Sequence, residues 1–405
     1  MLAMDGGTPV RAEPLPSPLT AAGRTIGVEE EQAVLRVLRS GMLSGVWGTE
    51  VAALTREFAE LIGTAHAVAC SSGTAALHLA VAAVDPAPGE EIIVPPISDM
   101  GTVFPVIAQN AVPVFADVDP ATGCLDPAAV QRAITPRTRA IIAVHLFGKP
   151  APVHELRRIA DGAGVLLIED CAQAYLAPVG DRLVGSVGHI GCFSLQQYKH
   201  ITAGDGGLVT TDDPALARSM RLFADKGWPR DTGERTYLSF ALNYRMTELV
   251  AAVARAQLRK LPEVVHRRRE GARRLADLLT DSPGPALPTD TGDHVYWYLP
   301  LLLEGLDAAG LRRYASALTA EGVPSQAGYL ARPLYAEPAV RDSAAYGGTG
   351  FPTRGVGDYS DGLCPVAEAL IERRLVVIPW NENFSDADVD DIATAIGRVH
   401  QEVAP

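Results

Sequence analysis

The sequence predicts an α/β fold, with a mainly parallel seven-stranded sheet between helices and a smaller α+β domain after it. Seven short apolar runs predict the strands, at 66–70, 91–95, 112–118, 139–146, 165–170, 189–195 and 207–211. Helical patterns separate most of these runs, among them 73–84, 127–134 and 152–163. Continuous runs of Val, Ile and Leu between helices are typical of a parallel sheet buried on both faces. The last run follows its predecessor too closely for a helical crossover, so we expect it to be antiparallel, in or near the same sheet.

The order of these patterns predicts an N-terminal arm over 1–24, a large domain over 25–262 and a small C-terminal domain over 263–405. The arm is rich in Pro and Gly. A helical pattern over 246–281 bridges the two domains, and Pro262 predicts a break or kink in it. Other elements are expected from their patterns: helices at about 27–40, 307–321 and 385–402, and strands at 294–303 and 375–379.

Composition and charge restrict the classes of partner. The 405 residues include 35 Lys and Arg against 48 Asp and Glu, a net charge of -13, which argues against nucleic acid or an anionic membrane. The N-terminus lacks the features of a signal peptide, and no apolar run approaches the roughly 18 residues that span a bilayer. We therefore expect a cytoplasmic protein. The cysteines and histidines show no C-x-x-C, H-x-x-x-H or H-E-x-x-H spacing, so no metal site is predicted.

Two groups of residues follow predicted strands, where open α/β sheets bind ligands. Gly73 and Thr74 open a helix, whose backbone N–H groups and dipole can hold a phosphate. Most segments with this pattern, however, only cap a helix and bind no phosphate. Asp170 ends the run 165–170, and a buried carboxylate needs a partner such as a protonated pyridine nitrogen. A cap on the next turn explains this aspartate equally well.

The third group is FSLQQYKHITAGDGGLVTT at 193–211. Lys199 precedes a glycine-rich loop, whose bare backbone permits close approach to a ligand. A lysine amine can condense with an aldehyde and then carry protons, and Ser194 can donate its hydroxyl to a phosphate. Most lysines, however, are solvated surface charges. The loop lacks the spacing of a nucleotide-binding P-loop.

Taken in order, these motifs resemble the DegT/DnrJ/EryC1/StrS family of sugar and cyclitol aminotransferases. The resemblance covers nearly the whole chain and includes DGGTPVR, RSGMLSGVWGTEV, SSGTAAL, VPVFADVDP, AVHLFG, IEDCAQA, FSLQQYK with AGDGG, and NYRMTELVAA. It implies the aspartate-aminotransferase-like fold, known as fold type I, with pyridoxal 5′-phosphate as the cofactor.

The resemblance also implies a role for each matching residue. Lys199 matches the catalytic lysine that holds the cofactor as a Schiff base, and Asp170 matches the carboxylate that pairs with the pyridinium nitrogen. Gln173 matches a position near the ring and its phenolic oxygen. The matches to phosphate ligands are Gly73, Thr74 and Ser194, with Asn243 reaching the phosphate of the neighbouring subunit. This last match implies a homodimer with shared active sites, in which loop 225–242 lies at the interface.

Two positions depart from the family pattern, and both concern the acceptor substrate. Asp99 and Met100 stand where relatives carry an aromatic residue that stacks on the cofactor ring. Either Met100 covers the ring or the acid of Asp99 faces the substrate, and a local shift that turns Asp99 away is an equal alternative. Tyr335 occupies a position where many relatives have histidine.

The reaction implied by the resemblance moves an amino group from glutamate or glutamine to a keto-cyclitol or keto-sugar, in aminoglycoside-type or amino-sugar biosynthesis. Other carbanion chemistry of the same cofactor, such as epimerisation, dehydration or elimination, stays open. The dehydratase branch carries histidine in place of the lysine, so Lys199 argues against it. A non-catalytic sensor needs a DNA-binding extension, which this acidic chain with its short Pro- and Gly-rich arm does not offer.

Overall fold

The apolar runs of the sequence form the central sheet. The computed structural model describes residues 1–280, 284–288, 291–342, 346–353, 355, 357 and 359–403. Among them, seven strands form one sheet in the order β1-β9-β8-β5-β4-β2-β3. They are β1 His66–Cys70, β2 Glu91–Val94, β3 Val112–Phe115, β4 Thr138–Val144, β5 Leu166–Asp170, β8 Ile190–Ser194 and β9 Gly207–Thr211. Strand β9 is antiparallel to both neighbours and the other pairs are parallel, which confirms the predicted fold class and the antiparallel strand.

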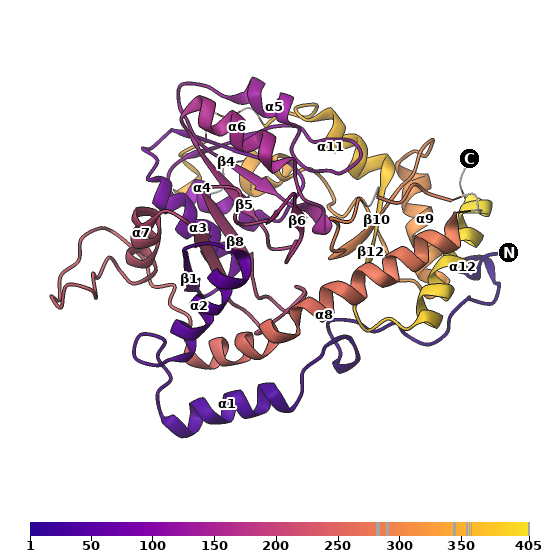
Figure 1. Ribbon diagram of the computed structural model, residues 1–405. Coiled ribbons are helices and arrows are strands. Elements are labelled where there is room, and N and C mark those ends of the chain that lie inside the picture. Colours follow the sequence, from indigo (N-terminus) through magenta and orange to yellow (C-terminus); the bar gives the residue numbers. More distant parts are fainter. Residues whose placement is uncertain are drawn as a thin grey trace.

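Helices cover the sheet and continue into the C-terminal part of the chain (Figure 1). They are α1 Val28–Ser40, α2 Glu50–Ile62, α3 Gly73–Val84, α4 Phe104–Ala108, α5 Pro127–Ala133, α6 Val153–Ala163, α7 Pro214–Ala224, α8 Glu248–Leu279, α9 Ala308–Ala320, α10 Pro338–Arg341, α11 Pro365–Ala369 and α12 Asp386–Val403. Several begin at side-chain caps. Asp126 and Asp213, for example, accept the first free N–H groups of α5 and α7, each of which starts with proline. No helix in the described part of the chain is both long enough and apolar enough to cross a membrane.

The long helix α8 is continuous through Pro262, so of the break or kink predicted there, the break does not occur. Proline has no N–H to donate to the carbonyl of Leu258, which normally costs about 3 kcal/mol inside a helix. Leu261 is fully buried, and Val264 and Val265 are buried just after the proline. Apolar packing on both sides of the proline therefore outweighs the missing hydrogen bond. Figure 1 shows α8 running from the large sheet to the C-terminal elements as one helix.

A second, smaller sheet has the order β10-β12-β11, with antiparallel pairs. Its strands are β10 Tyr298–Leu302, β11 Gln326–Ala327 and β12 Leu375–Pro379, and a hairpin elsewhere pairs β6 Pro178–Val179 with β7 Arg182–Leu183. Strand β10 is shorter than the predicted 294–303 because Tyr296 has a left-handed backbone, with φ of 48°. Helices α9 and α12 and the fully buried Leu2 of the arm share the apolar cluster of this sheet.

Candidate active site

A cavity of about 500 Å³ lies where the loops after β1, β2, β5 and β8 meet the start of β10. The residues predicted from the sequence that line it are Gly73, Thr74, Asp99, Asp170, Ser194 and Lys199. The carboxyl ends of β2 and β5 lie at this edge of the sheet, which is the edge at which open α/β sheets bind ligands. Tertiary structure thus gathers residues that are separated by up to 126 positions in the chain.

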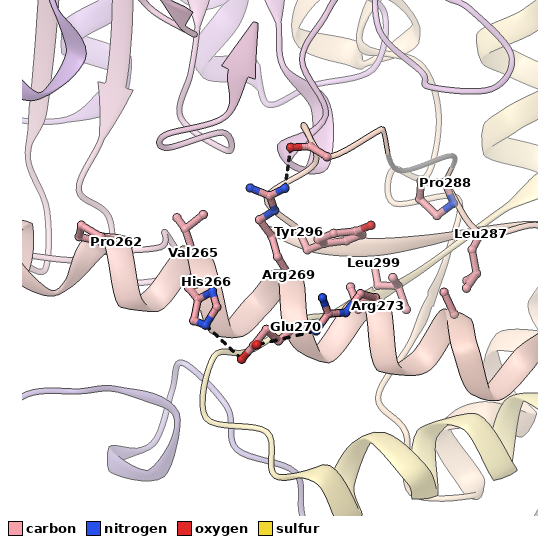
Figure 2. A pocket seen from close by; sticks show the side chains of 13 residues that line it. Pro262, Val265, His266, Arg269, Glu270, Arg273, Leu287, Pro288, Tyr296 and Leu299 are labelled. Carbon is pink, nitrogen blue, oxygen red and sulfur yellow. Dashed lines mark hydrogen bonds and ion pairs between the residues drawn. The ribbon is translucent and has the colours of Figure 1, made fainter. Parts of the chain in front are cut away.

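A larger groove of about 720 Å³ runs along α8 (Figure 2), but its polar groups are engaged with one another. His266 and Arg273 both contact the carboxylate of Glu270, at 3.2 and 3.8 Å. Arg269 donates to the carbonyl oxygen of Gly292 over 2.6 Å. None of the residues predicted for the site lines this groove. The cavity at the sheet edge is therefore the candidate active site.

The first turn of α3 forms one side of the cavity. Ser72 caps this helix, since its hydroxyl oxygen accepts the N–H of Ala75 over 3.0 Å. A Cβ on Gly73 would lie 2.6 Å from the Cβ of Ser194 and 2.9 Å from its Oγ, so only glycine fits at this position. The helix start and the hydroxyls of Thr74 and Ser194 line the same space. Such a set of N–H and O–H donors at a helix N-terminus suits a phosphate.

Asp170, the last residue of β5, is 5% exposed and reaches the same cavity. Its Oδ2 accepts the hydroxyl of Thr102 over 3.0 Å, and its Oδ1 accepts the N–H of Ala172 over 3.1 Å. Burial raises the pKa of Asp170 above its usual value, and these hydrogen bonds together with the charge of Lys199 offset the rise only in part. A cationic group bound in the cavity would stabilise this carboxylate.

The amine of Lys199 projects into the cavity. Its Nζ lies 4.1 Å from the centroid of the Trp297 ring. Burial lowers the pKa of Lys199 to about 8, while the charges of Asp170 and Asp99 act in the opposite direction. The neutral amine, which is the nucleophilic and proton-accepting form, is therefore accessible near neutral pH.

The cavity also has an aromatic wall, formed by Trp297, Tyr298 and Tyr329, that was not predicted from the sequence. The rings of Trp297 and Tyr298 stack, with centroids 4.2 Å apart and 2° between their planes. Nε1 of Trp297 donates to the carbonyl of Tyr198 over 2.7 Å, which ties the wall to the residue before Lys199. The cluster of aromatic residues at the start of a predicted strand is the available signal in the sequence.

Gln173 lies behind this wall and is 4% exposed. Its side-chain oxygen accepts the N–H of Phe147 over 2.7 Å, and its Nε2 donates to the hydroxyl of Tyr329 over 3.3 Å. The residue does not line the cavity itself. In this structure it therefore reaches the site through Tyr329.

Asp99 and Met100 point to different places. Asp99 lines the cavity, and one of its carboxylate oxygens accepts the N–H of Gly101 over 2.8 Å. The side chain is exposed, so its other oxygen is accessible to a ligand. Met100 instead packs against the apolar core and is not part of the lining. Of the two expectations, the geometry favours an acidic group that faces the cavity over a methionine that covers a bound ring.

Besides Gln173 and Met100, two further residues predicted for the site lie outside the cavity. Tyr335 is fully buried, where its hydroxyl donates to Glu368 over 2.6 Å and accepts the N–H of Cys364 over 3.3 Å. The structure thus corrects the expectation that Tyr335 contacts the acceptor, because both faces of its ring are enclosed by the core next to Phe115. Asn243 is exposed and follows loop 225–242 on the protein surface.

His145, Glu169 and Cys171 form a buried group whose ligand atoms could hold a metal ion by type. His145 Nε2 lies 3.0 Å from Glu169, and its Nδ1 accepts the N–H of Ala151 over 3.0 Å. The Glu169 carboxylate also accepts three backbone N–H groups, those of Gly185, Val187 and Gly188. These contacts satisfy the polar atoms of both side chains, so the group is explained as a buried hydrogen-bond network.

The cavity as a whole combines four chemical features. It offers an anion cradle at α3, a buried carboxylate at Asp170, a nucleophilic amine at Lys199 and a flat aromatic wall. These features match a planar aromatic ligand that carries a phosphate, a basic ring nitrogen and an aldehyde carbon. Two observations support this match most directly: a single Cβ would fill the cradle at Gly73, and burial raises the pKa of the Asp170 carboxyl.

Comparisons with known proteins identify the family of this chain. The model of the DegT/DnrJ/EryC1/StrS aminotransferase family matches residues 24–397. The L-glutamine:2-deoxy-scyllo-inosose aminotransferase of Streptomyces kanamyceticus is 39% identical, over 100% of this chain and 97% of its own length. The UDP-N-acetyl-3-dehydro-alpha-D-glucosamine 3-aminotransferase of Acidithiobacillus ferrooxidans is 36% identical, over 88% of this chain and 90% of its own. The crystal structure of an aminotransferase from Psychrobacter cryohalolentis has a TM-score of 0.83 and 30% identity, and covers 94% and 98% of the two chains.

Proposed function

The chain belongs to the DegT/DnrJ/EryC1/StrS aminotransferase family, and from this premise we propose that it transfers an amino group from glutamine or glutamate to a free keto-cyclitol. It is a pyridoxal 5′-phosphate-dependent enzyme of fold type I. When bound, this cofactor supplies an aldehyde carbon for amine exchange and an electron-withdrawing ring. The single observation that carries the proposal is the placement of Lys199, Asp170 and the α3 cradle around one cavity.

We assign the cofactor contacts as follows. Gly73, Thr74 and Ser194 would hold the phosphate, and Asp170 would keep a proton on the ring nitrogen. The stacked rings of Trp297 and Tyr298 offer a flat surface beside the amine of Lys199. Gln173 would act through the hydroxyl of Tyr329, to which it donates.

Lys199 has two tasks in this proposal. Its Nζ would hold the cofactor through the aldehyde carbon. Its neutral amine would accept a proton from Cα of the donor, and in the reverse direction it would return a proton to the carbon of the acceptor that becomes aminated. The pKa of about 8 supports this exchange, because both protonation states of the amine are accessible near neutral pH.

Charge in the cavity supports a free, uncharged acceptor. Three carboxylates line it, those of Asp99, Asp170 and Asp205, against one cationic side chain, Lys199. A nucleotide-linked sugar brings a diphosphate, which such a surface repels unless the neighbouring subunit supplies cations. The accessible oxygen of Asp99 is suited to accept a hydrogen bond from a ring hydroxyl. The relative from Streptomyces kanamyceticus is named for a cyclitol acceptor and glutamine as donor, which agrees with this choice.

A nucleotide-linked keto-sugar is the second candidate acceptor, because the relative from Acidithiobacillus ferrooxidans is named for a UDP-linked sugar. The two acceptors can be separated by direct competition. Purified enzyme is loaded with amino groups from glutamine, then mixed with equal amounts of 2-deoxy-scyllo-inosose and a UDP-linked 3-keto-sugar, and the products are separated by mass. We expect amination of the cyclitol. Preferential amination of the UDP-sugar would overturn the choice of acceptor without affecting the assignment of the cofactor site.

The cofactor site itself is tested by the absorption spectrum of the native enzyme and of Lys199→Ala. We expect a visible band that requires Lys199 and that disappears when glutamine or glutamate is added. Arg11→Ala serves as the control, since Arg11 binds Asp388 and Asp391 far from the cavity. A band that persists unchanged in Lys199→Ala would show that this lysine does not bind the cofactor.

We also propose that the enzyme is a homodimer in which Asn243 completes the site of the neighbouring subunit. Exposed apolar side chains support an interface near this residue: Trp47 is 69% exposed, Tyr237 55% and Phe240 89%. Trp47 and Tyr237 lie near each other, since Arg230 lies over the rings of Trp47 and Trp228 and the ring of Trp228 is 6.4 Å from that of Tyr237. Exposed apolar groups that gather in this way are typical of a protein interface. The division into an arm over 1–24, a large domain over 25–262 and a small domain over 263–405 stays a prediction, as does a cytoplasmic location.

Mixing two inactive variants tests the shared site. Lys199→Ala and Asn243→Ala are refolded together, so that half of the dimers contain one chain of each kind. In a mixed dimer, one site receives both substitutions and the other receives neither. Recovery of about a quarter of wild-type activity is therefore expected for equal mixing. If the two residues act in the same subunit, the mixture stays as inactive as its components.

A further inference from the structure

The N-terminal segment 17–24 lies between the loop after β8 and the residues after β12. Gln197 of that loop donates its Nε2 to the carbonyl of Pro18 over 2.7 Å. From the other side, Asn381 donates its Nδ2 to the carbonyl of Gly23 over 3.1 Å. Side chains from two distant parts of the chain therefore hold the backbone of this segment.

Arg24 ends the segment and is 7% exposed. Its Nη1 donates to the backbone carbonyl of Lys199 over 2.8 Å, and its Nη2 donates to the backbone carbonyl of Gln197. The rigid fork of a guanidinium can span two acceptors in this way. One buried side chain thus bridges two backbone carbonyls in the turn that carries the reactive amine.

A buried guanidinium in this setting is costly. Within the described residues, no carboxylate lies within ion-pair distance of Arg24, and its buried Nε has no hydrogen-bond partner. The nearest acidic influence is Glu382, which itself binds Arg268 over 2.6 Å. Burial lowers the pKa of Arg24 to about 10, a decrease that the charge of Glu382 opposes without cancelling. A charge held in this way normally destabilises a fold, so a purely structural purpose explains it poorly.

We infer that Arg24 is a positioning residue, which fixes the backbone of Lys199 so that the amine stays above Trp297 and beside Asp170. The inference rests on the proposed role of Lys199. A second buried arginine holds the facing wall, since Arg268 donates to the backbone carbonyl of Trp297 over 3.2 Å. The amine and the ring beneath it are thus fixed by two separate guanidinium groups. The N-terminal segment becomes a support of the active site, although it contributes no residue to the cavity lining.

The first experiment measures the reactivity of Lys199 in cofactor-free protein. Wild type, Arg24→Met, Arg24→Lys and Arg11→Ala are labelled with trace acetic anhydride from about pH 6 to about pH 11, and the acetylated Lys199 peptide is quantified by mass spectrometry. Methionine fills much of the volume of arginine and removes an uncompensated charge, so Arg24→Met is expected to fold. Arg11→Ala is the matched control, because it loosens the arm at Asp388 and Asp391 without a contact to the Lys199 turn.

In Arg24→Met we expect the midpoint of Lys199 labelling to move from about 8 toward that of an ordinary lysine, because the amine is no longer held in its buried position. Arg24→Lys keeps the positive charge and some hydrogen-bond donors but loses the planar guanidinium. Its midpoint of Lys199 labelling should therefore lie between those of Arg24→Met and wild type. Arg11→Ala should keep the wild-type midpoint although its Tm falls. Wild-type midpoints in both Arg24 variants would overturn the inference, and so would the same shift in Arg11→Ala.

Steady-state kinetics of the loaded enzyme provide a second measurement. Loss of alignment at the amine predicts that kcat falls by about 10- to 100-fold in Arg24→Met while KM for the amino donor changes little. A fall in kcat of the same size in Arg11→Ala would identify a general effect of the arm and contradict the inference. Failure of the proposed function would give a different result, because the visible band would then persist in Lys199→Ala, a variant in which Arg24 is intact.

Discussion

Thr102 donates its hydroxyl to Oδ2 of Asp170 over 3.0 Å, and both side chains are buried. The bond favours the charged form of the carboxylate against the burial that raises its pKa. Thr102→Val should therefore raise the pKa of Asp170 further and move the acid limb of kcat/KM to higher pH, with a loss of about 10-fold or more at the optimum. Thr210→Val is the control, because Thr210 is buried in the same sheet and donates to Gly185 away from the cavity. An unchanged acid limb in Thr102→Val would contradict the assignment of Asp170.

Gly73→Ala should weaken cofactor binding, because the added Cβ would lie 2.6 Å from the Cβ of Ser194 and intrude on the phosphate cradle. We expect the Kd for pyridoxal phosphate to rise by about 10- to 100-fold, measured by titration of cofactor-free enzyme, which corresponds to the loss of one to two good contacts. Gly162→Ala provides the matched control in helix α6, where the new Cβ would meet no atom within 4 Å. That variant should bind the cofactor normally and be slightly stabilised.

Tyr329→Phe and Tyr335→Phe separate a cavity residue from a core residue. Tyr329 lines the cavity and accepts a hydrogen bond from Gln173, so removal of its hydroxyl should change KM for the acceptor. Tyr335 donates to Glu368 inside the core, so Tyr335→Phe should lower the free energy of unfolding by about 1–3 kcal/mol and leave KM unchanged. Measurement of KM for the acceptor and of Tm in both variants tests these two expectations. A change of acceptor KM in Tyr335→Phe alone would restore the role that the sequence suggested.

The stability of cofactor-free enzyme should depend on pH through Lys199. Its amine titrates near 10.5 in an unfolded chain and at about 8 in the folded protein. Between these values the unfolded chain binds the extra proton, so the stability of wild type rises with pH relative to Lys199→Met. At pH 7 the variant should be more stable, by on the order of 2 kcal/mol, and the difference should shrink as pH rises through this window. Chemical denaturation at about pH 7 and about pH 10 measures it, and a difference independent of pH would contradict the lowered pKa of Lys199.

Much of this protein follows from local pattern. The apolar runs and the helices between them predicted the seven-stranded sheet, and even the antiparallel β9 followed from the short connection before it. The motifs around Lys199 and Asp170 predicted the family and the cofactor, and the comparisons confirm both. These features can be predicted from the sequence because each depends on residues that are close together in the chain, through hydrophobic periodicity, turn-forming residues and ordered motifs.

Other features were decided only when distant parts of the chain came together. Apolar packing kept α8 continuous at Pro262, although local chemistry predicted a break or a kink there. Tyr335 was enclosed in the core, while Trp297 and Tyr329, which no motif marks, became walls of the cavity. Arg24 reached the backbone of Lys199 across 175 positions of sequence. Contacts of this kind depend on how domains and segments pack. They join residues that are far apart in the sequence, so a local sequence pattern cannot predict them.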